Sequence, residues 1–96
     1  MRVVLTREAS ADLENVLSHI ATSNPAAAAT VAARIDRTLS IVGDFPGAGR
    51  LDPDTGTRDW LVTGLPLLVI YTIQIDFVEV IGVFHTSRDP QTKPRA

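Results

Sequence analysis

The stretch VEVIGVFHTSRDP, residues 78–90, decides how the fold of this chain is interpreted. It begins as a nearly continuous apolar run, which indicates a buried strand. His85, Arg88 and Asp89 follow at the point where the apolar residues end. A strand that delivers polar side chains at its end holds them on rigid backbone, so this ending is a candidate functional site.

Two helices are predicted well before this strand. Thr6 is a suitable N-cap for the first, and apolar residues then recur with helical spacing from Ala9 to Ile20. Asn24 followed by Pro25 indicates the start of a second helix, which ends near Gly43. Because only a few residues separate the two segments, an antiparallel helical hairpin is expected.

Four strands are predicted, at about residues 2–5, 57–62, 67–75 and 77–84. Residues 45–56 are rich in Gly, Pro and Asp without apolar periodicity, and we interpret them as a loop. The last two strands are apolar on both faces, whereas one helical hairpin covers only one face of a sheet. The other face is therefore a candidate surface for a protein partner or for self-association.

Composition limits the choice of function. The 96 residues form one domain, predicted at 1–90 and followed by a polar tail at 91–96, and there is no cysteine to form a disulfide. The formal charge of −2 weighs against a general nucleic-acid binder, which needs a positive excess. No apolar run is long enough to span a membrane, and no secretion signal is recognisable, so a cytoplasmic location is expected.

The residues suited to chemistry are few. His19 and His85 are the only histidines, and neither a metal-ligand motif nor a phosphate- or dinucleotide-binding loop is present, so no metal or cofactor is expected. His85 beside Arg88 could be a general acid or base next to a phosphate-binding guanidinium. The alternative is an ordinary strand end in which Arg88 pairs with Asp89 or with a carboxylate of a helix. Spacing alone favours this second interpretation.

A second group of candidates could bind an anion or a partner. Arg50, Arg58 and Arg88 could form an anion-binding cluster, although surface arginines are usually solvated or paired. Trp60 could anchor a partner, although core packing is its commoner role.

Six short motifs, taken in order, resemble the RelE/ParE superfamily of bacterial type II toxins. They are Ala9-x-x-Asp12-Leu13, Asn24-Pro25, Phe45-Pro46-x-x-Gly49-Arg50, Arg58, Pro66-Leu67 with Ile70-Tyr71, and His85-x-x-Arg88-Asp89-Pro90. The resemblance implies an α+β fold of order β-α-α-β-β-β, with a helical hairpin packed on a four-stranded, mainly antiparallel sheet. It also implies an antitoxin partner whose C-terminal segment wraps the toxin and covers its surplus apolar surface.

Two activities occur within this superfamily. RelE-like members cut messenger RNA in the ribosome, whereas ParE-like, plasmid-stabilising members inhibit DNA gyrase by binding and perform no chemistry. This chain is acidic and lacks a lysine-rich second helix, and its Gly49-Arg50 loop resembles ParE. The resemblance therefore favours a gyrase inhibitor that is neutralised by its antitoxin.

The residues expected to bind target or antitoxin are Arg50, Arg58, Trp60, Arg88 and Asp89. The first alternative is a ribosome-dependent endoribonuclease that uses His85, Arg88 and Arg58. The second is an inactive remnant that binds only an antitoxin.

Overall fold

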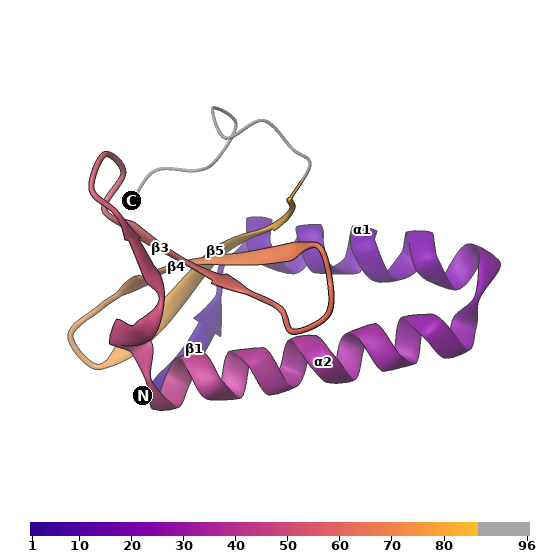
Figure 1. Cartoon of the computed structure of the whole chain (residues 1–96), viewed down its shortest axis with the longest axis horizontal. Coiled ribbons are helices and arrows are strands. Elements are labelled where there is room, and N and C mark those ends of the chain that lie inside the picture. The colour runs from indigo at the N-terminus through magenta and orange to yellow at the C-terminus, as the bar shows by residue number, and fades with distance from the viewer. Residues whose placement is uncertain (87–96) are drawn as a thin grey trace.

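A helical hairpin packs against one face of a twisted sheet in the computed structural model, which describes residues 1–86 (Figure 1). The elements in chain order are β1 (Arg2–Leu5), α1 (Arg7–Ser23), α2 (Pro25–Asp44), the 3₁₀ turn η1 (Pro46–Ala48), β2 (Arg50–Asp52), β3 (Thr57–Leu61), β4 (Leu67–Ile73) and β5 (Phe77–His85). This α+β architecture confirms the predicted fold class.

Both helices begin where the sequence predicts. The Thr6 hydroxyl accepts a hydrogen bond from the Ala9 N–H at 3.1 Å, and the Asn24 side chain accepts one from the Ala27 N–H at 3.0 Å. These side chains satisfy backbone donors that the first turn of a helix leaves without partners. Asn24 also ends α1 by donating its backbone N–H to Ile20, so a single residue separates the two helices.

The sheet has five strands in the order β1-β5-β4-β3-β2, whereas the sequence predicted four. The additional strand β2 lies within residues 45–56, so the prediction of an uninterrupted loop there was wrong. Three residues are too few to show an apolar alternation, and β2 is defined instead by its antiparallel pairing with β3. Gly56, with φ of 73°, closes the turn between them, a conformation that favours glycine.

The core lies between the helical hairpin and one face of the sheet. Its buried members on the helices are Ala9, Val31, Ile35 and Val42, and they pack against Val62, Leu67, Val69, Tyr71, Val78, Val80 and Val83. Alternate residues of β4, namely 67, 69 and 71, point toward the helices, as the pleat of a strand requires.

The Asp12 side chain of α1 is hydrogen-bonded to the part of β5 that extends past β1. The register of β1 on β5 ends at Leu5 opposite Val80. Beyond that point the Asp12 carboxylate accepts a hydrogen bond from the Val83 N–H at 3.1 Å. A helix carboxylate thus takes the place of the missing neighbouring strand, which keeps a buried N–H group satisfied.

The face of the sheet turned away from the helices retains apolar side chains. Leu61 and Leu68 lie opposite each other in β3 and β4, and Leu61 is 52% exposed. A partner-binding role for this face remains a prediction. No helix within residues 1–86 is long and apolar enough to cross a membrane.

Candidate functional site

Arg58 holds the loop that follows α2. It lies on β3, on the helix side of the sheet, opposite Tyr71 of β4. One nitrogen of its guanidinium donates hydrogen bonds to the carbonyl oxygens of Gly47, at 3.1 Å, and Gly49, at 2.9 Å. Two hydrogen bonds from Arg58 thus hold the loop around η1 in place.

Tyr71 holds the same loop from the core. Its hydroxyl donates to the Pro46 carbonyl at 2.6 Å and accepts from the Gly49 N–H at 3.1 Å. Burial raises the pKa of the Tyr71 phenol; the Gly49 hydrogen bond and the Arg58 charge act in the opposite direction, and the Asp59 charge adds to the increase. The phenol therefore stays protonated and remains a hydrogen-bond donor at neutral pH.

Gly49 permits this close approach of loop and ring. A Cβ at this position would clash with the Tyr71 hydroxyl and would lie 2.9 Å from the ring carbon that carries it. The backbone of Gly49 is extended, with φ of −67°, so the requirement for glycine is one of space rather than of backbone conformation. The motif Gly49-Arg50 thus contains a residue needed for packing next to an exposed charge.

Arg50 lies on the opposite face of the sheet from Arg58. Its register partner is Asp59, and the two side chains form an ion pair at 3.1 Å. The Arg50 side chain is 81% exposed whereas that of Asp59 is 6% exposed. Because their strands place Arg50 and Arg58 on opposite faces, these two arginines do not form one anion-binding cluster.

The remaining residues predicted to bind a partner are placed as follows. Trp60 is half-buried and packs against the edge of the core, opposite Val69. Arg88 and Asp89 lie outside the described residues.

His85 and Arg58, the two described members of the alternative nuclease site, are far apart. His85 at the end of β5 lies opposite Leu67 of β4, whereas Arg58 lies opposite Tyr71, four residues further along that strand. At about 3.3 Å per residue the two positions are separated by about 13 Å along β4 alone. The structure therefore does not bring this pair together around one substrate atom.

His85 instead shares a cavity with His19, to which the sequence assigned no role. The cavity has a volume of about 270 Å³ and is otherwise lined by apolar side chains of α1, α2 and the segment leading into β4. His19 approaches it from α1 and His85 from the end of β5. Within residues 1–86 there is no group of three or more His, Cys, Asp or Glu side chains that could hold a metal ion.

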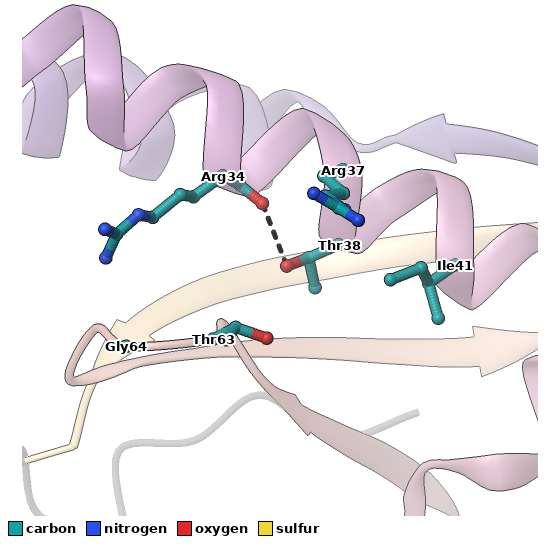
Figure 2. Close-up of a pocket in the computed structure, with 6 residues that line it drawn as sticks. All are labelled: Arg34, Arg37, Thr38, Ile41, Thr63 and Gly64. Carbon is teal, nitrogen blue, oxygen red and sulfur yellow. Dashed lines mark hydrogen bonds between the residues drawn. The ribbon is translucent and has the colours of Figure 1, made fainter.

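A larger groove lies between α2 and the turn from β3 to β4 (Figure 2). Its volume is about 540 Å³, and the residues that line it are Arg34, Arg37, Thr38, Ile41, Thr63 and Gly64. The groove was not predicted from the sequence. The sequence does contain one indication of it: Arg34 and Arg37 are three residues apart and therefore lie on the same side of their helix. The turn that faces them could not be placed without the fold.

Comparisons with known proteins agree with this architecture. The family model for the ParE toxin of the type II toxin–antitoxin system parDE matches residues 3–90. A protein of Sinorhizobium fredii named "Putative toxin Y4kP" is 31% identical over 84 residues, which are 88% of this chain and 86% of that protein.

A solved structure described as the chromosomal ParDE toxin–antitoxin system from P. aeruginosa has a similar fold. It superposes with a TM-score of 0.77 at 20% identity, covering 88% of this chain and 95% of the other. The match of the family model over nearly the whole sequence establishes the relationship. The chain therefore belongs to the ParE toxin family and is the toxin component of a type II toxin–antitoxin system, which implies an antitoxin as its partner.

Proposed function

We propose that this toxin inhibits DNA gyrase by binding to it in the cytoplasm, and that its antitoxin neutralises it by occupying the toxin surface. Membership of the ParE family carries this proposal. The separation of His85 from Arg58 supports it, because general acid–base cleavage of RNA needs the acid or base and a phosphate-stabilising cation around the same phosphate.

Arg58 and Arg50 differ in how accessible they are to a target protein. Arg58 is held by two carbonyl oxygens of the loop after α2, so its role is to position that loop. Arg50 extends from an edge strand and is 81% exposed, so its guanidinium is accessible to a protein partner. We propose that Arg50 contacts the target, and that Arg88 and Asp89 are further candidates for this contact. Trp60 lies on β3, which pairs with the edge strand β2, and we assign it a supporting role there.

A supercoiling assay with purified gyrase and purified toxin tests the proposal. The wild-type protein should inhibit supercoiling, and addition of the antitoxin encoded with it should restore the reaction. Arg50→Gln should weaken inhibition, whereas Arg7→Gln, an exposed change at the start of α1, should not. Unchanged supercoiling at micromolar wild-type toxin would refute gyrase as the target.

Two further measurements separate the alternatives. Primer extension on messenger RNA in a translating extract would show codon-positioned cuts if the chain were a ribosome-dependent nuclease, and His85→Ala would abolish them. Induction of the toxin alone would leave bacterial growth unaffected if it were an inactive remnant.

A further inference from the structure

We propose that the groove between α2 and the β3–β4 turn binds acidic side chains of the antitoxin. This inference deepens the proposed function and depends on the existence of that partner. Figure 2 shows the arrangement: Arg34, Arg37 and Thr38 project from α2, and Thr63 and Gly64 form the opposite wall.

The two guanidinium groups carry charge that the described chain does not neutralise. Arg34 and Arg37 are both exposed residues of α2. The ion pair found within residues 1–86 joins Arg50 to Asp59, and neither groove arginine takes part in one there. Two uncompensated positive charges on one side of a helix, in a chain of net charge −2, form a local site for a carboxylate.

The turn that faces the arginines lies close to the guanidinium of Arg34. Gly64 has φ of 75°, which L side chains rarely adopt. A Cβ at Gly64 would lie 2.8 Å from a terminal nitrogen of Arg34, so a larger residue would displace that guanidinium. The Arg34 head group thus lies next to the turn, so a ligand seated between α2 and the turn would meet its charge.

The other residues that line the groove indicate which kind of anion it can bind. Ile41 supplies apolar surface at one end of the groove and Thr63 supplies a hydroxyl, while the Thr38 hydroxyl is already engaged as a donor to the Arg34 carbonyl at 2.9 Å. A carboxylate on an aliphatic stem, as in Glu or Asp of an amphipathic segment, matches this mixture of apolar and basic surface.

A nucleic acid fits the groove less well. Affinity for a phosphate backbone comes from many cations spread over an extended basic surface. The groove offers two guanidinium groups, and the chain as a whole is acidic. We therefore assign the groove to a protein partner and treat RNA as an outcome to be tested.

The test is calorimetric titration of the full-length toxin with the antitoxin encoded with it, at low and at moderate salt. The double variant Arg34→Gln/Arg37→Gln keeps most of each side chain but removes both charges. It should bind the antitoxin about ten-fold or more weakly, and the salt dependence of its affinity should be smaller. Arg7→Gln, on α1, is the matched control and should bind as the wild type does. Circular dichroism verifies that each variant is folded.

The outcomes separate this inference from the proposed function. If the wild-type toxin binds no antitoxin, both fail. If it binds and the double variant binds equally well, the groove assignment is wrong while the proposed function stands. If the double variant instead loses only the binding of a fluorescent single-stranded RNA, the groove is a nucleic-acid site and the inference is overturned.

Discussion

Replacement of Tyr71 by Phe tests how the loop after α2 is held. The change removes one hydroxyl that donates to the Pro46 carbonyl and accepts from the Gly49 N–H. Gly49 is buried, so its N–H would lose its partner inside the protein, at a cost of about 1–3 kcal/mol. The half-buried Pro46 carbonyl adds about 1 kcal/mol. We expect Tyr71→Phe to lower the free energy of unfolding by about 2–4 kcal/mol.

Urea denaturation, monitored by circular dichroism and by the fluorescence of the single tryptophan, measures this loss. The midpoint of thermal unfolding should fall by about 10 °C or more for a domain of this size. Thr22→Val is the matched control, because it removes an exposed hydroxyl that donates to the Ser18 carbonyl at 2.9 Å. It should change stability by less than about 0.5 kcal/mol. An equally small effect for Tyr71→Phe would refute this account of the loop.

Three further predictions concern the same elements. Gly49→Ala should lower the urea midpoint markedly, because its Cβ clashes with the Tyr71 ring, whereas Gly47→Ala, with open space around it, should not. Absorbance at 295 nm follows the single tyrosine, and the midpoint of its ionisation should lie above the unfolded pKa of 10.0. Because the folded pKa is raised, the stability contributed by the neutral phenol is complete below pH 10 and is lost as pH rises further. Asp12→Ala should destabilise by about 1–3 kcal/mol in urea titrations by leaving the Val83 N–H without its acceptor.

The helical hairpin could be predicted closely because its signals are local. Thr6 and Asn24 act within three residues of their own positions, and both caps form as expected. The long strands were also predictable, since β4 and β5 are nearly continuous apolar runs. Strand β2 was not, because its three residues are held by pairing with β3 and carry no pattern of their own.

The candidate site was less predictable because it depends on which faces and ends of the strands meet. Arg50 and Arg58 are close in sequence and were grouped together, but the pleat places them on opposite faces. His85 was considered with Arg58, whereas their partners on β4, Leu67 and Tyr71, lie four residues apart. The contact between Arg34 and the Gly64 turn joins residues thirty positions apart, and no local pattern contains that information.

The order of strands in the sheet has a consequence for how the toxin is made. β5 lies between β1 and β4, and Arg2 pairs with Phe77, so the first strand to leave the ribosome waits for the last described strand before it can join the sheet. Pairing between residues so distant in sequence is slow to form. A partly synthesised chain therefore lacks the strand that joins β1 to the rest of the sheet and cannot present the finished toxin surface. The antitoxin meets a competent toxin only once β5 has been synthesised.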